Sequence, residues 1–156
     1  MNAFWEVFEP ANVVRDLRAV EREGVLAELV GTLVSGGTLA RREGEKALEL
    51  LRKREALGST GIGGGVAIPH VKMPGLRRIA AALGLSRTGI DYRSVDGVRV
   101  RVVFLVLRPD GEEEEHLRFL RWISNLARNR VIARFALAAK DVPEVVGLLR
   151  EFSESP

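Results

Sequence analysis

Two histidines, and the residues just before the first of them, are the part of this sequence best suited to chemistry. His70 follows Pro69 at the end of the segment "GIGGGVAIPH", and His116 is the other histidine of the chain. An imidazole has an ordinary pKa of about 6.5, so near neutral pH it can act as a nucleophile, a base or a ligand. Pro69 restricts the backbone that orients His70. His70 is therefore a candidate reactive residue, although lone histidines are also common in structural positions.

Three consecutive glycines, Gly63, Gly64 and Gly65, precede His70 by a few residues. Glycines form permissive turns, and successive backbone amides in such turns also form nests for anions. No Gly-Lys-Ser/Thr follows them, which excludes a P-loop. A helix is expected before them and a strand after them, which excludes a dinucleotide fingerprint. Two interpretations of the glycines stay open: an ordinary turn, or a loop whose backbone amides approach a phosphate-like charge.

Metal and thiol chemistry find little support in the composition. The chain has no cysteine, which excludes disulfides, thiolate catalysis and sulfur-based zinc sites and is typical of a cytoplasmic protein. The two histidines and a carboxylate from residues 112–115 have the donor types of a zinc site, but no H-E-x-x-H spacing exists. Glutamates at a helix start usually interact with the helix dipole. We predict no metal site and no cofactor.

The length and charge of the chain set further bounds. It has 156 residues and a formal charge of +3, from 24 lysines and arginines and 21 acidic residues. The basic residues are dispersed among glutamates, which favours solvated helix faces over a nucleic-acid footprint. No apolar run approaches the roughly 18 residues that span a bilayer, and the N-terminus lacks the features of a secretion signal. We expect one cytoplasmic domain over residues 1–156 that binds no nucleic acid and does not insert into a membrane.

The elements that must position the candidate residues begin with two helices. Apolar residues recur at helical spacing over residues 21–35, and a second helix is expected over 39–56 with Thr38 as its N-cap. After the glycines we expect strands at 66–68, 79–85 and 98–107, then a helix from the glutamates at 112–115 with Leu117 on its inner face, and helices at 131–139 and 141–152. This order predicts an α/β fold, a single layered domain whose mixed sheet of about five strands is flanked by helices.

The segment "REALGSTGIGGGVAIPH" closely resembles the active-site segment of phosphotransferase-system EIIA domains of the fructose, mannitol and nitrogen-regulatory type. The shared pattern is an Arg-Glu pair that ends a helix, a leucine, a threonine-containing turn, a glycine-rich loop and Ala-hydrophobic-Pro-His. The residues that match it are Arg54, Glu55, Leu57, Thr60, Gly61, Gly63, Ala67, Ile68, Pro69 and His70. A second signature, a histidine followed by leucines that opens a helix after an apolar strand, is similar to "HLRFLRWISNLARN", which begins at His116.

The resemblance implies a phosphocarrier. The family accepts a phosphoryl group from the phosphohistidine of HPr and passes it to a cysteine of an EIIB domain, or uses its phosphorylation state as a regulatory signal. By position, His70 is the implied nucleophile, His116 the supporting hydrogen-bond donor and Arg54 the phosphoryl-stabilising residue. A guanidinium offers a fork of donors that suits phosphate oxygens. The Thr60 hydroxyl and the glycine amides of residues 63–65 are weaker candidates for phosphate binding.

Two positions depart from the family pattern. Val71 stands where glycine often follows the histidine, and Gly64 stands where some members have a polar or acidic residue. Neither change removes the nucleophile. The "STGIGGGVAIPH" loop and Lys72 lean slightly toward the nitrogen-regulatory or fructose branch, which leaves sugar transport and regulation both open. The alternative is a non-catalytic regulatory module with the same fold that binds target proteins.

Overall fold

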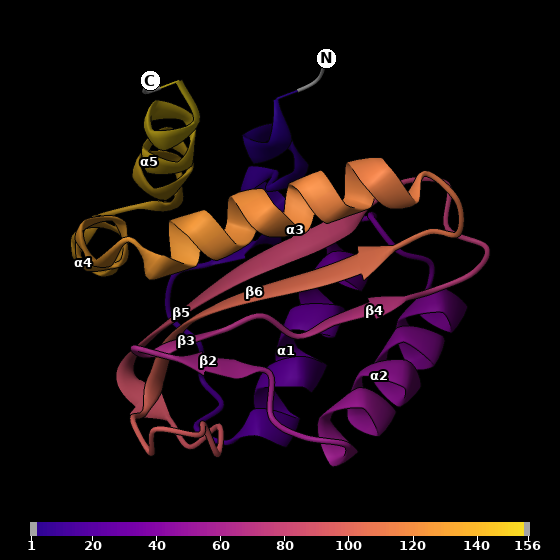
Figure 1. Cartoon of the computed structure of the whole chain (residues 1–156), viewed down its shortest axis with the longest axis horizontal. Coiled ribbons are helices and arrows are strands. Elements are labelled where there is room, and N and C mark those ends of the chain that lie inside the picture. Colours follow the sequence, from indigo (N-terminus) through magenta and orange to yellow (C-terminus); the bar gives the residue numbers. More distant parts are fainter. Residues whose placement is uncertain (1–2, 155–156) are drawn as a thin grey trace.

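The computed structural model describes residues 3–154 as an open, mixed β-sheet with helices on both faces (Figure 1). The helices are α1 (Arg22–Ser35), α2 (Arg41–Ala56), α3 (Glu113–Arg128), α4 (Arg130–Ala138) and α5 (Val142–Glu154), preceded by the 3₁₀ helices η1 (Phe4–Val7) and η2 (Pro10–Asn12). The strands are β1 (Val13–Val14), β2 (Gly61–Gly63), β3 (Val66–Ala67), β4 (His70–Lys72), β5 (Ala80–Ile90) and β6 (Val100–Arg108). The predicted α/β class is confirmed, with six strands in place of about five.

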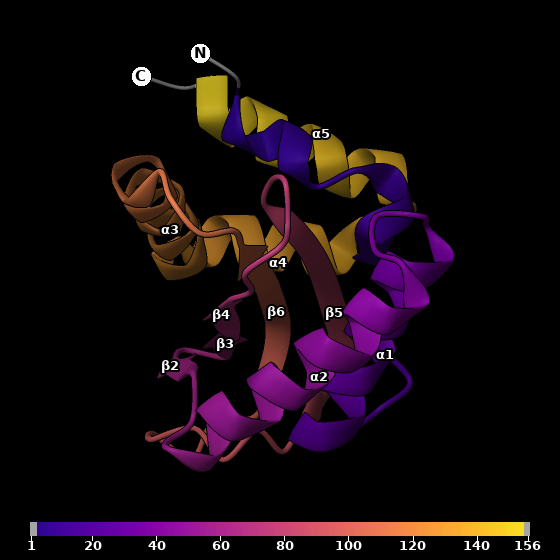
Figure 2. The same ribbon diagram turned by 90° about the vertical axis from the view of Figure 1, so that its right-hand side faces the viewer.

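Two apolar layers cover opposite faces of the sheet. Figure 2 shows α1 and α2 together on one side of β5 and β6, and α3 on the other. Along β6, Val103 and Leu105 belong to the layer under α1 and α2, whereas Phe104 and Val106 belong to the layer under α3, α4 and α5. Burial on both faces explains why the sequence of β6 is almost continuously apolar.

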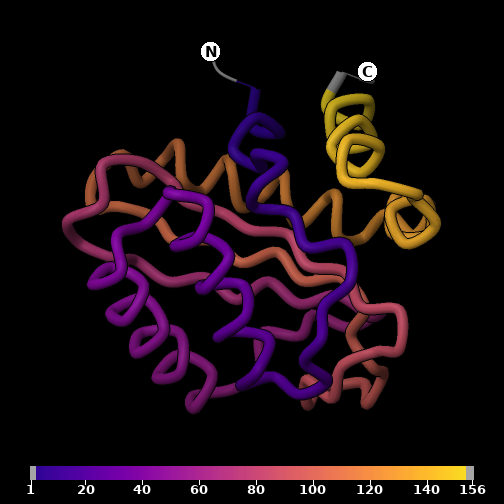
Figure 3. Tube along the Cα trace, turned by 180° about the vertical axis from the view of Figure 1, so that it is seen from behind, coloured from indigo at the N-terminus to yellow at the C-terminus, as the bar shows by residue number. Residues whose placement is uncertain are grey.

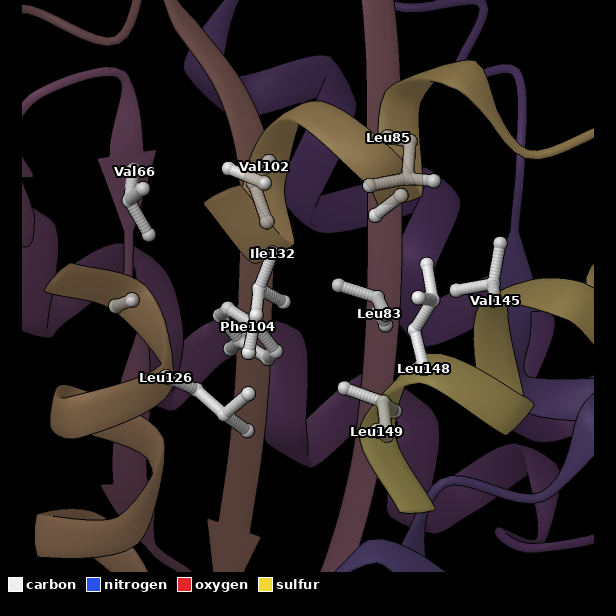
Figure 4. A pocket seen from close by; sticks show the side chains of 13 residues that line it. Val66, Leu83, Leu85, Val102, Phe104, Leu126, Ile132, Val145, Leu148 and Leu149 are labelled. Atoms are coloured by element: carbon white, nitrogen blue, oxygen red, sulfur yellow. The ribbon is translucent and has the colours of Figure 1, made fainter. Parts of the chain in front are cut away.

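The N-terminal segment completes the layer on the α3 side. Phe4 and Phe8 pack against Phe119 of α3, with ring centroids 5.4 and 6.3 Å away. The helix η1 also contacts α5, so the two ends of the described chain lie on the same side of the molecule (Figure 3). Between α4, α5 and the sheet lies an apolar cavity of about 10 Å³, which side chains such as Phe104, Ile132 and Leu148 line (Figure 4). This volume is about that of one water-sized sphere, so the cavity is a packing gap and not a ligand site.

Two details of the helices differ from the expectations. Thr38 is not the N-cap of α2: the cap is Ala40, whose N–H donates to the Glu43 carboxylate at 2.8 Å. The Thr38 hydroxyl instead accepts a hydrogen bond from the Asn12 side chain at 3.0 Å. Leu117 is 49% exposed. The inner face of α3 is formed instead by residues at helical spacing, namely His116, Phe119, Ile123 and Leu126.

The strand beside β6 is interrupted just before His70. Val66 of β3 pairs with Val102, and His70 of β4 pairs with Val106, in one continuous parallel register. Pro69 lies between the two pieces and has no N–H for the ladder, although its carbonyl accepts a hydrogen bond from the Val106 N–H at 2.9 Å. The strand β2 pairs with β3 alone. Within residues 3–154, β4 therefore has no strand on its outer side, and His70 lies at an open edge of the sheet.

Of the helices that the structure describes, none combines the length and the apolarity that crossing a bilayer requires.

Candidate functional site

His70 is held by a contact with its own backbone. The ring Nδ1 lies 2.7 Å from the carbonyl oxygen of Ile68. Because a carbonyl oxygen only accepts hydrogen bonds, Nδ1 carries the hydrogen and donates it. The neutral ring then has its lone pair on Nε2, which makes no hydrogen bond within residues 3–154. Since the side chain is half-buried at an open sheet edge, Nε2 is the ring nitrogen available to act as a nucleophile.

The two histidines share one face of the sheet. Paired residues on neighbouring strands point to the same face, and Val106, the partner of His70, packs in the layer under α3. Val71 packs in the opposite layer, as the alternation of a strand requires. His116 lies in the first turn of α3 on its inner face and is 3% exposed. The register of β4 thus puts His70 on the α3 side of the sheet, and α3, whose first turn carries His116, follows the end of β6 (Figure 1).

His116 has an unusual hydrogen-bond status. Its Nδ1 is buried and has no hydrogen-bond partner within the described chain. Most buried polar atoms in proteins are paired. The residue also lines a groove of about 750 Å³, whose other walls include η1, the turn after α1 and the loop before β5. The structure thus leaves His116 with an unpaired ring nitrogen beside a groove. The position of His116 on the inner face of α3 explains its burial.

Arg54 is in the last turn of α2 and is half-buried. Its Nη1 donates to the carbonyl of Gly58 at 2.8 Å, and within the described range no hydrogen bond joins it to either histidine. The helix α2 packs against β4, on the face of the sheet opposite α3. The helix that carries Arg54 therefore lies on the opposite face of the sheet from the His70 ring, and the open edge of β4 lies between them.

The three glycines are not brought to His70. They form the β2–β3 turn with φ angles of +92°, +67° and +86°, which side chains rarely adopt. The N–H of Gly64 donates to Asp96 Oδ2 at 3.0 Å, and the N–H of Val98 donates to Oδ1 at 3.1 Å. These two bonds hold the pKa of Asp96 below its ordinary range. The turn thus already binds a carboxylate of the same chain.

The strand register separates this turn from the histidine. Val66, at the end of the turn, pairs with Val102, and His70 pairs with Val106, four residues further along β6. At about 3.3 Å per residue, these positions are about 13 Å apart. The turn formed by Gly63, Gly64 and Gly65, whose Gly64 amide binds Asp96, therefore lies at the opposite end of the strand from the imidazole.

Thr60 is also bound within the protein. The residue is 5% exposed, and its hydroxyl and its N–H both donate to the carboxylate of Glu55. Glu55, Tyr92 and Arg22 complete this buried group, and sequence reasoning gave none of these three a separate role. One signal for Glu55 was present, since it follows Ala47 and Leu51 at four-residue spacing on the buried face of α2.

No cluster of three or more histidine, aspartate or glutamate side chains in residues 3–154 is arranged to hold a metal ion.

Known proteins share both the sequence and the architecture of this chain. The EIIA 2 family of the phosphoenolpyruvate-dependent sugar phosphotransferase system matches residues 6–152. The chain is 33% identical over 144 residues to a nitrogen regulatory protein of Bradyrhizobium diazoefficiens, with 92% of each chain covered. It is 32% identical over 146 residues to the fructose-specific EIIABC component of Bacillus subtilis. This match covers 94% of this chain but 23% of that protein.

The structural comparison agrees. The crystal structure of the nitrogen regulatory protein IIA-Ntr from Neisseria meningitidis superposes with a TM-score of 0.82 at 27% identity, covering 95% of this chain and 99% of that one. The mannitol IIA of Escherichia coli shares the fold, with a TM-score of 0.73 at 18% identity over 91% of this chain and 98% of that one. The chain therefore belongs to the EIIA 2 family of the phosphoenolpyruvate-dependent sugar phosphotransferase system.

Proposed function

We propose that residues 1–156 act as one phosphocarrier domain in which His70 accepts a phosphoryl group from the phosphohistidine of an HPr-type protein. The observation that supports this most is the bond from Nδ1 to the Ile68 carbonyl. That bond leaves the Nε2 lone pair free on a half-buried ring at an open sheet edge, where a partner protein can reach it.

The transfer follows from this geometry. The Nε2 lone pair attacks the phosphorus, the bond from phosphorus to the donor nitrogen breaks, and its electron pair returns to the donor imidazole. Positive charge develops on the His70 ring as the new bond forms, and the Ile68 carbonyl dipole at Nδ1–H stabilises it. Phosphoryl transfer needs mainly positioning and charge stabilisation, so few other groups are required and no metal step enters the proposal.

The supporting roles go to residues that have donors to spare. His116, on the same face of the sheet, donates a ring N–H to the phosphoryl oxygens. Arg54 turns its unused guanidinium donors toward them around the edge of β4. The Gly64 amide and the Thr60 hydroxyl have partners within the protein, and the turn of residues 63–65 lies at the far end of the strand from His70. In this proposal these groups shape the segment and do not touch the phosphate.

In a transport chain, His70 passes the phosphoryl group on to the cysteine of an EIIB domain. In a regulatory chain no such acceptor is needed, and the phosphorylated and unphosphorylated forms bind a target protein differently. A solved complex of E. coli mannitol IIA with phosphorylated IIB has the same fold, with a TM-score of 0.72 at 16% identity. Relatives named for nitrogen regulation and for fructose are about equally similar. Both roles therefore stay open in this proposal, and either role belongs in the cytoplasm.

The test is incubation with the general phosphotransferase enzyme, HPr and labelled phosphoenolpyruvate. The wild-type chain should gain an acid-labile phosphate that maps to His70, and a folded His70→Ala variant should gain none. Uptake by His70→Ala at the wild-type level would refute the assignment of the nucleophile. No uptake by the wild-type chain would favour the non-catalytic binding module. Release of the label on addition of an EIIB domain would indicate the transport role.

A further inference from the structure

A buried carboxylate lies next to Arg54 but points the other way. The side chain of Glu55 is 3% exposed and receives four hydrogen bonds. Its Oε2 accepts from the Thr60 N–H at 3.2 Å and from Arg22 Nη1 at 3.4 Å. Its Oε1 accepts from the Tyr92 hydroxyl at 2.9 Å and from the Thr60 hydroxyl. An ionised carboxylate has about four acceptor sites, so Glu55 is fully bonded as an anion.

A continuous line of hydrogen bonds joins Glu55 to His70. Glu55 holds the N–H and the hydroxyl of Thr60. The carbonyl of Thr60 accepts a bond from the N–H of Ile68 at 3.1 Å. The carbonyl of Ile68 then accepts the bond from His70 Nδ1 at 2.7 Å. Three contacts in sequence therefore lead from the interior of the protein to the ring that is exposed at the edge.

Hydrogen bonds on two sides of Ile68 fix the direction of its carbonyl, so a change in either bond should turn that carbonyl. On one side, the carbonyl of the next residue, Pro69, bonds to the Val106 N–H of β6. On the other side, Thr60 bonds to the Ile68 N–H. Because β4 has no outer strand within the described chain, Thr60 and its anchor Glu55 replace the support that a neighbouring strand would give.

We propose that Glu55 is a positioning residue for His70: by fixing Thr60 it holds the Ile68 carbonyl where that oxygen accepts Nδ1–H and keeps the lone pair on Nε2. Glu55 touches neither the ring nor the phosphate. Its effect on transfer rests on the proposed function, since it matters there only if His70 accepts a phosphoryl group. Its effect on the tautomer of His70 does not depend on any partner.

The test compares Glu55→Gln with Tyr92→Phe. Glutamine keeps the shape of Glu55 but replaces one acceptor oxygen with an NH₂ group that cannot accept. Tyr92→Phe removes one donor to the same carboxylate. The Tyr92 hydroxyl also lies 3.1 Å from the Thr60 hydroxyl, but its removal leaves both bonds from Thr60 to Glu55 in place. Burial raises the pKa of Tyr92, so its hydroxyl is a donor throughout the experiment. Both variants weaken the buried group, and only the first disturbs the positioning of Ile68.

Two quantities are measured: the ¹⁵N chemical shifts of the His70 ring at pH 8, which report the tautomer, and the rate of phosphoryl uptake from phospho-HPr. We expect Glu55→Gln to lower the Nδ1–H fraction and to slow uptake about tenfold, as a small misplacement of a nucleophile does. Tyr92→Phe should keep both at wild-type values. The proposal is overturned if Glu55→Gln keeps the wild-type shifts and rate, or if Tyr92→Phe changes them equally.

A second variant covers the case in which Glu55→Gln does not fold. Thr60→Val keeps the backbone bonds of Thr60 to Glu55 and to Ile68, and removes the hydroxyl with its bond to Glu55 and its contact with the Tyr92 hydroxyl. It should change the His70 shifts in the same direction and slow uptake by about threefold, a smaller misplacement of the same kind. Unchanged shifts in folded Thr60→Val overturn the positioning role. If the wild-type chain takes up no phosphate, the proposed function fails, while the ¹⁵N shifts still decide the role of Glu55.

Discussion

The two ends of the interrupted strand formed by β3 and β4 are built in opposite ways. At the β3 end, three glycines turn the backbone, and an amide of the turn donates to the exposed carboxylate of Asp96. At the β4 end, a backbone carbonyl accepts from the ring of His70, and the buried carboxylate of Glu55 holds the neighbouring segment. At the glycine end, the Gly64 amide already has a hydrogen-bond partner, whereas at the histidine end the lone pair of His70 Nε2 has none within residues 3–154. The end that the proposed function makes reactive is therefore the one with an unused acceptor.

The two carboxylates differ in what their loss should cost. Asp96 is exposed and accepts two backbone bonds, and water can replace it. Glu55 is buried and accepts four bonds, which water cannot replace without opening the structure. Removing one partner of a buried charged group is costly, because the other groups are left buried and unpaired.

The largest effect should therefore follow from Glu55→Ala. We expect the free energy of unfolding to fall by about 3 kcal/mol, since Arg22 and the hydroxyls of Thr60 and Tyr92 lose their common acceptor. Urea unfolding followed by circular dichroism measures this. Glu49→Ala on the same helix is the matched control: Glu49 pairs with Lys53 on the surface and should matter little. Equal effects of the two changes would mean that the buried group does not stabilise this end.

The sequence reveals much of the fold but little of this end of the strand. Helices α1 and α5 follow from apolar periodicity, and β6 from its apolar run. The strand β4 is three residues long, follows a proline and has no periodicity of its own, because it forms only by pairing with β6. The strand β1, two residues long beside β5, escapes sequence reasoning for the same reason.

The candidate site shows a similar division. The pattern around His70 identifies that residue, because Pro and His stand together after an apolar segment. It does not reveal that Glu55 is buried, because a glutamate usually faces water, and its partners Arg22 and Tyr92 lie 33 and 37 residues away in the sequence. It also suggests that the glycine turn lies near His70, whereas the register of β3 against β6 separates the two.

Arg54→Ala tests whether the Arg54 guanidinium contributes to phosphoryl transfer at the histidine end. We expect phosphoryl uptake to slow about thirtyfold, which is about 2 kcal/mol in the barrier, because the guanidinium donors to the phosphoryl oxygens are lost. The fold should survive, since the hydrogen bond that the change removes within residues 3–154 is the one to the Gly58 carbonyl. Rapid-quench measurement with phospho-HPr gives the rate.

The control for Arg54 is Arg52→Ala, which removes an arginine two residues earlier that pairs with Glu23 on the surface. It should leave the uptake rate unchanged. If Arg54→Ala unfolds the chain, the role of Arg54 is structural. The histidine end then has no arginine that stabilises the phosphoryl group.

Gly65→Ala separates conformational cost from chemistry at the glycine end. The φ angle of Gly65 is +86°, and an added Cβ would meet only the Arg99 carbonyl oxygen at an ordinary 3.5 Å. The loss of stability should therefore be purely conformational, about 1 kcal/mol, with the uptake rate unchanged. Gly31→Ala in α1, where nothing lies within 4 Å of the added Cβ, should stabilise the chain. Slower uptake by Gly65→Ala would place the turn in the phosphoryl site after all.

The smallest effect should come from Asp96→Asn, and it should depend on pH. The N–H groups of Gly64 and Val98 lower the pKa of Asp96 below its ordinary value of 3.8. A carboxylate with a depressed pKa in the folded state stabilises the protein above its unfolded pKa, and this stabilisation is lost as the pH falls through the folded value. The wild type should therefore be slightly more stable than Asp96→Asn at pH 6, and the difference should shrink below pH 3.8. Unfolding curves at both pH values measure it. Phosphoryl uptake by His70 should be the same in both chains, because the turn lies about 13 Å along β6 from that ring. A stability difference that stays constant with pH would show that the charge of Asp96 does not hold the turn.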